Sequence, residues 1–183
     1  MHKQIDYSGL KFENSKIILS EIDQSSYLAA MIADFIRHQL TEQGVNFSFE
    51  TVMSDESKVR FLQETKSKGY RNYLYFVCTD DPATNVGRVR ERTENNGHDV
   101  SIDKIVDRYP RSLALLYDAV MLSSRAFLFD NSGEKRKFIC EIENAKTITL
   151  AKDLKAGDLP DWFITHFVMK LPKALLDSLK FPQ

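Results

Sequence analysis

Glycine is scarce in this sequence, and the spacing of the glycines excludes one common device for holding a triphosphate. The seven glycines stand at positions 9, 44, 69, 87, 97, 133 and 157. A Walker-type phosphate loop, GxxxxGK[ST], needs two glycines five positions apart followed by Lys and Ser or Thr, because its backbone amides close around the phosphates. No pair of glycines in the 183 residues has that spacing.

Cysteines are few, net charge is low and long apolar runs are missing. The two cysteines, Cys78 and Cys140, each lie in an apolar, strand-like run, so we expect both to be reduced core residues. A formal net charge of −1 gives no reason to expect general affinity for nucleic acid or acidic membranes. No run approaches the length of a membrane span, and the opening MHKQIDYSGLKF lacks the apolar stretch of a signal peptide. We therefore expect a cytoplasmic protein without nucleic-acid or membrane partners.

Apolar residues are abundant enough for a full core. Hydrophobic residues make up 43% of the 183 residues, which is typical of a globular chain and not of a disordered one. No internal repeat and no low-complexity linker divides the sequence. We therefore expect one domain over residues 1–183.

The spacing of apolar residues predicts helices and strands in alternation. Helices are expected from Ser26 to a stop at Gly44, from a Ser54 cap to Gly69, from Pro82 onward, from Ile102 to Val120, and from Pro160 through Met169; strands are expected at Val45–Phe49, Tyr73–Cys78, Arg125–Asp130 and Phe138–Ile142. This order suggests βαβ units. The predicted fold class is therefore α/β, a mostly parallel sheet with helices on both faces.

Local signals refine three of these elements. Ser54 supplies a hydroxyl cap ahead of two acids, and Pro82 suits the first position of its helix. The run Tyr73–Cys78 is continuously apolar, as expected of a strand covered on both faces. Pro110 interrupts a long apolar stripe, so we expect a kink or a fresh helix start near Tyr109.

Arginines gather in the middle of the chain. Arg88 and Arg92 are four residues apart on one predicted helix, so they share a face and repel each other. Beyond the Gly97 loop, Arg108 lies at helical spacing from Lys104 and Arg111. Any single arginine fits a solvated surface equally well. As a set, Arg88, Arg92, Arg108 and Arg111 favour binding of a phosphate.

Other charged pairs have plainer explanations. Arg90 with Glu94, and Asp107 with Arg111, fit exposed ion pairs four residues apart, which contribute little to stability. The loop histidine, His98, has no second ligand at metal-binding spacing. We therefore expect no metal ligands and assign no catalytic residue from the sequence.

Two segments follow predicted strands, where open α/β sheets place their ligand crevices. Glu50 could bind a hydroxyl or accept its proton there, although on spacing alone a helix cap or an arginine pair explains it better. Residues 131–133 (Asn-Ser-Gly) could contact a ligand through backbone groups, but the local pattern fits a plain hairpin turn better.

Several short segments, taken in order, resemble the zeta toxin family of P-loop kinases. They are SYLAAMIADFIRHQL, FSFETVMS, GYRNYLYFVCTDDP, RVRERTENNGHDV, RYPRSL and FLFDNSG, spanning about residues 26–133. Each segment is weakly specific, but their order and spacing together indicate the family. Residues 134–183 would then be a C-terminal extension with a strand and a terminal helix.

The resemblance implies a three-layer P-loop-NTPase-like sheet, with ATP and Mg²⁺ as cofactors. The toxins of the family transfer the γ-phosphate of ATP to a UDP-activated amino sugar, so it implies a nucleotide and a nucleotide sugar as ligands and an antitoxin as a partner. The implied sites are acceptor contacts at Glu50, Thr51 and Ser54 and a lid over ATP at Arg88, Arg92, Arg108 and Arg111.

The sequence departs from the family pattern at its start. The first strand, the phosphate loop and the catalytic Asp of the family are not recognisable before Ser26, and Pro110 within RYPRSL is a further departure. A missing first strand would leave a gap in the sheet or an exposed edge, which Lys16–Ser20 could partly fill. We therefore expect an N-terminally shortened kinase domain that is inactive alone. The alternatives are a non-catalytic remnant that binds an antitoxin or itself, and a gene product without a selected role.

Overall fold

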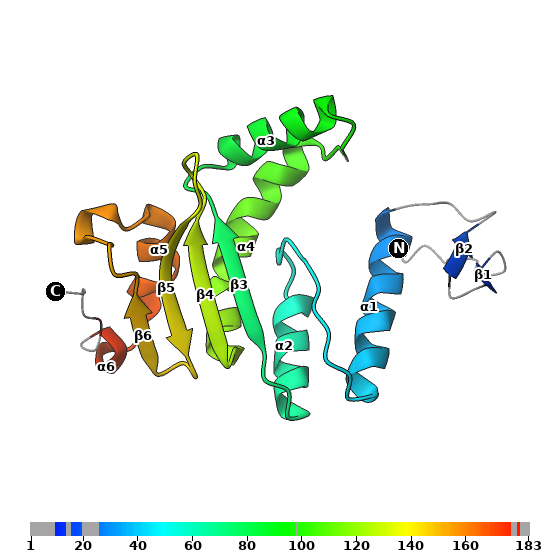
Figure 1. Ribbon diagram of the computed structural model, residues 1–183, viewed down its shortest axis with the longest axis horizontal. Helices are drawn as coiled ribbons and strands as arrows, with labels where there is room; N and C mark the ends of the chain where they lie inside the picture. The colour runs from blue at the N-terminus through cyan, green and yellow to red at the C-terminus, as the bar shows by residue number, and fades with distance from the viewer. Residues whose placement is uncertain (1–9, 14–15, 20–25, 98, 177–178, 180–183) are drawn as a thin grey trace. The chain divides into compact units, whose positions relative to one another are not determined.

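The computed structural model describes residues 10–13, 16–19, 26–97, 99–176 and 179 (Figure 1). The chain divides into two compact units, Met1–Glu50 and Thr51–Gln183.

The first unit contains a hairpin and a helix. Strands β1 (Leu10–Glu13) and β2 (Lys16–Leu19) pair antiparallel in a two-stranded sheet of their own. Helix α1 (Ser26–Glu42) ends at Gly44, as predicted. Gly44 takes a φ of +68°, and its N–H donates to Thr41 O, which is the left-handed helix end that glycine favours.

The strand predicted at residues 45–49 is wrong, because the structure forms no strand over residues 45–54. Its aromatic side chains contact other groups instead. The Phe47 and Phe49 rings stack with centroids 6.3 Å apart, and the Arg37 guanidinium lies 4.8 Å from the centre of the Phe49 ring. Residues two apart share one face in a strand as well, so the stacking does not decide the matter; among the described residues, no neighbouring strand pairs with the backbone of this segment.

The second unit holds the remaining elements. They are α2 (Ser57–Ser67), β3 (Tyr73–Cys78), α3 (Pro82–Glu94), α4 (Ile102–Leu122), β4 (Arg125–Asp130), β5 (Lys137–Glu143), β6 (Thr147–Leu150), α5 (Asp161–His166) and α6 (Lys173–Leu176), with 3₁₀ turns at Ala156–Asp158 and Val168–Lys170. The strands predicted within residues 73–78, 125–130 and 138–142 are confirmed. β6 was not predicted.

The four strands form one mixed sheet in the order β3-β4-β5-β6. Only β3 and β4 are parallel, in register from Tyr73 opposite Arg125 to Cys78 opposite Asp130. The other two pairs are antiparallel, so the prediction of a mostly parallel sheet is wrong. The reason lies in the connections: residues 144–146 join β5 to β6, and two of them, Asn144 and Ala145, take positive φ, the geometry of a tight hairpin turn.

The core of this unit lies between one face of the sheet and the helices α4 and α5, which Figure 1 shows behind the strands. Leu128 and Ile142 of the sheet and Leu116 of α4 are fully or almost fully buried. From α5, the Trp162 ring lies 6.0 Å from that of Phe76 on β3. These helices therefore cover a single face.

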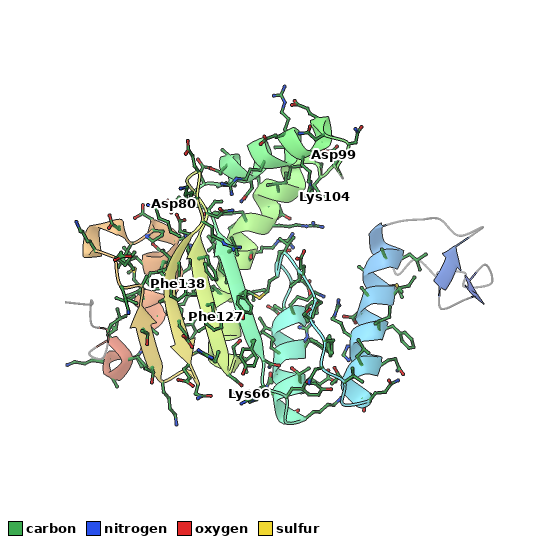
Figure 2. All side chains as sticks on the ribbon, viewed as in Figure 1. Lys66, Asp80, Asp99, Lys104, Phe127 and Phe138 are labelled. Carbon is green, nitrogen blue, oxygen red and sulfur yellow. The ribbon has the colours of Figure 1, made fainter. Side chains whose placement is uncertain are left out.

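The opposite face of the sheet is uncovered by the described helices of this unit. On β3 the side chains of Tyr73, Tyr75 and Val77 are 47%, 65% and 45% exposed. Figure 2 shows Phe127 and Phe138 on this same face, turned toward the viewer, and the Tyr75 and Phe127 rings stack at 4.9 Å. The prediction that Tyr73–Cys78 is covered on both faces is therefore wrong within this unit.

Local sequence signals predicted two helix boundaries correctly and a third one wrongly. α2 begins at Ser57 and not after a Ser54 cap, because the Asp55 carboxylate accepts from Ser57 N at 2.9 Å. The hydrogen bonds from Ser57 also hold the pKa of Asp55 below its usual value. α2 ends at Gly69 with φ +85°, and α3 begins at Pro82 with the Asp81 side chain as its cap, both as predicted.

Two helices differ from prediction in length. α4 is one continuous helix with Pro110 inside it, so the expected fresh start near Tyr109 does not occur. Its buried stripe, which includes Leu113 and Val120, anchors it to the sheet and offsets the roughly 3 kcal/mol that an interior proline costs. The terminal helix is shorter than predicted, because α5 ends at His166 and a separate 3₁₀ turn follows.

Candidate functional site

The carboxyl ends of the two parallel strands meet at one end of the sheet. There Asp80 N donates to Ser132 Oγ at 2.8 Å, and Ser132 Oγ donates to the Asp130 carboxylate at 2.6 Å. The same carboxylate accepts from the Trp162 indole N–H at 3.3 Å and is only 8% exposed. The Ser132 turn thus does more than reverse the chain, since its hydroxyl ties the end of β3 to the end of β4.

The electrostatics of this end raise the pKa of one carboxyl group. Partial burial raises the pKa of Asp80 above its usual value, and the nearby charges of Asp130 and Asp161 raise it further, while the hydrogen bond from Ser132 opposes the shift. In Figure 2, Asp80 marks this end of the strands. In the described part of the chain, no group of three or more His, Cys, Asp or Glu side chains could hold a metal ion.

Helix α3 brings Arg88 to this region. The half-buried Arg88 donates from Nη2 to Gly133 O at 3.2 Å, so α3 is fastened to the turn that follows β4. Arg92 lies one turn further on, where Gly97 N donates to Arg92 O at 2.8 Å. A Cβ atom at Gly97 would come within 2.4 Å of Arg92 Cγ, so only glycine fits beside the Arg92 stem.

Helix α4 connects three parts of the region. Tyr109 Oη donates to Thr79 O at the end of β3 at 2.6 Å, and Ser112 Oγ donates to Val52 O at 2.8 Å. The half-buried Arg108 lies four residues before Ser112, on the same face of the helix. The geometry therefore places Arg108 on the face that receives the segment of residues 51–54.

That segment is held by its middle residue. Met53 is 4% exposed, joins the core of the second unit and adopts a φ of 54°. Thr51 Oγ1 accepts from Met53 N at 3.1 Å, and Ser54 is half-buried. Glu50 is exposed and is the last residue of the first unit.

The predicted site residues thus fall into separate groups. The segment that contains Thr51 and Ser54 is bonded to α4, the helix that carries Arg108, whereas Arg88 reaches the turn after β4. Arg111 is exposed and pairs with Asp107 on its own helix, as the spacing suggested. The Arg90–Glu94 ion pair is also present. Binding of phosphate by the four arginines together stays a prediction.

Sequence reasoning missed Asp130 and its partner Trp162. One signal could have pointed to the aspartate, since RAFLFD is an apolar strand that ends in a carboxylate, and parallel strands carry ligand groups at their carboxyl ends. No signal in the sequence could have paired that carboxylate with an indole 32 residues away.

The two cysteines are buried and free, as predicted. Burial raises the pKa of the Cys78 thiol to about 12, and burial likewise raises the pKa of Cys140. Both thiols stay protonated near neutral pH, so neither can serve as a thiolate nucleophile.

No described helix is both long enough and apolar enough to cross a membrane. Comparison with curated proteins and with solved structures found no match. The family model described as Zeta toxin matches residues 19–119, which is more than half of the chain. The match includes the segment of residues 51–54 and the arginines of α3 and α4. The chain therefore belongs to the zeta toxin family.

Proposed function

We propose that this domain is the acceptor and lid side of a zeta-toxin-like ATP-dependent phosphotransferase. The observation that carries the proposal is the family match, which includes both the segment of residues 51–54 and the arginine-bearing helices α3 and α4. The hydrogen bond from Ser112 to Val52 supports it, because it fixes that segment on the face of α4 that carries Arg108.

The arginines suit a phosphorylated ligand by their chemistry. A guanidinium group is always charged and can donate two parallel hydrogen bonds to phosphate oxygens. In the proposed arrangement Arg88, Arg92, Arg108 and Arg111 contact the phosphates of the nucleotide. Glu50, Thr51 and Ser54 bind hydroxyl groups of the acceptor, for which we propose a UDP-activated amino sugar.

The phosphate side of the reaction needs groups that these residues do not supply. Phosphoryl transfer is normally stabilised by a phosphate loop, its Lys and bound magnesium. The 183 residues contain no GxxxxGK[ST], and the described acids form no metal-binding group. We therefore assign no magnesium to this chain's residues and expect it to bind the acceptor more readily than ATP.

Calorimetric titration of the 183-residue chain with UDP-N-acetylglucosamine and, separately, with ATP tests the proposal. We expect the nucleotide sugar to bind, and we expect Glu50→Ala to weaken that binding at least tenfold, because Glu50 is the proposed contact to a hydroxyl group of the acceptor. Glu94→Ala is the matched control, because Glu94 is an exposed acid that pairs with Arg90 on its own helix. Absence of binding to either ligand, or equal losses in both variants, would contradict the proposal.

A second candidate function is a non-catalytic interaction module that binds an antitoxin or another copy. The uncovered apolar face of the sheet favours it. The two candidates differ in one readout: a chain that captures a partner but neither binds the nucleotide sugar nor yields a phosphorylated product supports the interaction module.

A further inference from the structure

The outer edge of β3 has no strand beside it in the described residues, since β3 ends the sheet order. In a parallel pair, alternate residues direct their backbone groups to the same neighbour. Cys78 O accepts from Asn131 N, so the even-numbered residues of β3 bond toward β4. The N–H and C=O groups of Tyr73, Tyr75 and Val77 therefore point outward, away from β4.

The same three residues also expose their side chains. Tyr73, Tyr75 and Val77 are 47%, 65% and 45% exposed on the uncovered face of the sheet. Exposed strand edges are usually protected from pairing by lysines, prolines or bulges. The β3 sequence, YLYFVC, contains no charge and no proline, and it pairs with β4 without a register shift. β3 thus combines unpaired backbone groups with exposed apolar side chains.

We propose that two copies of this chain associate by antiparallel pairing of their β3 strands about a two-fold axis at Tyr75. A second copy fits because a two-fold axis makes one surface complementary to itself. The outward-pointing residues must face each other, so odd-numbered residues pair with odd-numbered residues. One such register pairs all three outward-pointing residues. It places Tyr75 opposite the second copy's Tyr75, and Tyr73 opposite the second copy's Val77.

In this register every outward-pointing backbone N–H and C=O group of β3 finds a hydrogen-bond partner in the second copy. Each of the three residue pairs exchanges two backbone hydrogen bonds, which gives about six between the copies. Neither strand carries a charge, so no repulsion opposes the pairing, and the aromatic and β-branched side chains of Tyr73 and Val77 meet across the axis. The two four-stranded sheets become one continuous sheet. This inference does not depend on the proposed phosphotransferase activity.

A charge-pair experiment tests the contact at the axis. Sedimentation velocity over a range of concentrations should show the wild-type chain passing from monomer to dimer. Tyr75→Lys and Tyr75→Glu should each weaken the dimer at least tenfold, because like charges then face each other at the axis. An equimolar mixture of the two variants should associate again. Tyr75→Thr is the control for loss of the ring, since it keeps the backbone N–H and a strand-forming residue.

Cross-linking tests the register. Tyr75→Cys should form a disulfide between copies under mild oxidation, because opposed residues of an antiparallel pair lie within disulfide range. Tyr73→Cys is the matched control: its counterpart in the second copy is four residues along the strand, about 13 Å away. We expect at least tenfold faster cross-linking for Tyr75→Cys. A mixture of Tyr73→Cys and Val77→Cys chains should cross-link to each other.

The native cysteines should not form cross-links between copies, because Cys78 is only 8% exposed and Cys140 is fully buried. Circular dichroism of each variant shows whether it is folded. A wild-type chain that stays monomeric at all concentrations overturns the proposal, whether its edge is left open or is filled within the chain. A dimer that Tyr75→Lys leaves intact, or equal cross-linking by Tyr75→Cys and Tyr73→Cys, overturns it as well.

Discussion

Both faces of the four-stranded sheet carry apolar side chains on β3 and β4, but the two faces differ in what these side chains contact. On β4, Ala126 and Leu128 are fully buried against the helices, while Phe127 and Phe129 are only half-buried on the other face. The alternation is that of a sheet with one covered face, which is common for antiparallel sheets and uncommon for parallel ones. The apolar character of a strand therefore does not tell how many of its faces are covered.

The largest expected difference between the faces concerns unfolding. Leu128→Ala should lower the free energy of unfolding by about 3 kcal/mol, because it leaves a cavity in the close-packed core. Phe127→Ala removes a larger side chain from the uncovered face and should cost less than half as much. Urea unfolding of both variants measures the two values. If the two losses are equal, the face that carries Phe127 is covered in solution.

Removing a polar group should likewise lower the free energy of unfolding more on the covered face than on the uncovered face. Asp130→Ala should cost about 2 kcal/mol, because it leaves the donors of Ser132 and Trp162 without their acceptor. On the uncovered face, Arg125 pairs with Glu141, and Arg125→Ala should leave stability almost unchanged, since exposed ion pairs contribute little. Urea unfolding again measures both. A marked loss for Arg125→Ala would show that its ion pair is shielded from water.

The two faces should also differ in how stability depends on pH. Burial raises the pKa of the Cys78 thiol from 9.0 to about 12, so the folded state favours the protonated thiol. The stability that results is fully present below pH 9 and is lost as the pH rises from 9 to 12. Cys78→Ala should therefore lose less stability across that range than the wild-type chain does.

The control for the pH effect is a thiol on the uncovered face. In a Val77→Cys chain the new side chain replaces one that is 45% exposed. It should be alkylated by iodoacetamide far faster than Cys78 at pH 8, because it is accessible and its ionisation is not opposed by deep burial. Similar alkylation rates for both thiols would mean that the covered face opens readily.

Parts of the fold could be predicted because their causes are local. Gly44 and Gly69 end their helices since the chain needs positive φ there, and Pro82 starts a helix since the first position needs no N–H. The existence of the three predicted strands from β3 to β5 followed from continuous apolar runs. Their pairing did not, because a run of apolar residues does not specify the direction of the neighbouring strand.

The candidate site was predictable only in outline. The family resemblance selected the segment of residues 51–54 and the arginines, and Arg90–Glu94 and Asp107–Arg111 formed ion pairs at the spacing expected on a helix. The link from Ser112 to Val52 joins residues 60 apart, and the link from Arg88 to Gly133 joins residues 45 apart. Such contacts arise from packing between elements, which no local pattern encodes.

By itself the sequence determined the positions of most helices and strands, the reduced state of both cysteines and the resemblance to a kinase family, because each depends on residues close together in the chain. Only the tertiary structure decided that the sheet is mixed, that the described helices of its unit cover one face, and that no described strand pairs with the outer edge of β3. The physical reason is that strand partners and buried faces are selected by contacts between residues far apart in sequence, where packing overrides local preference.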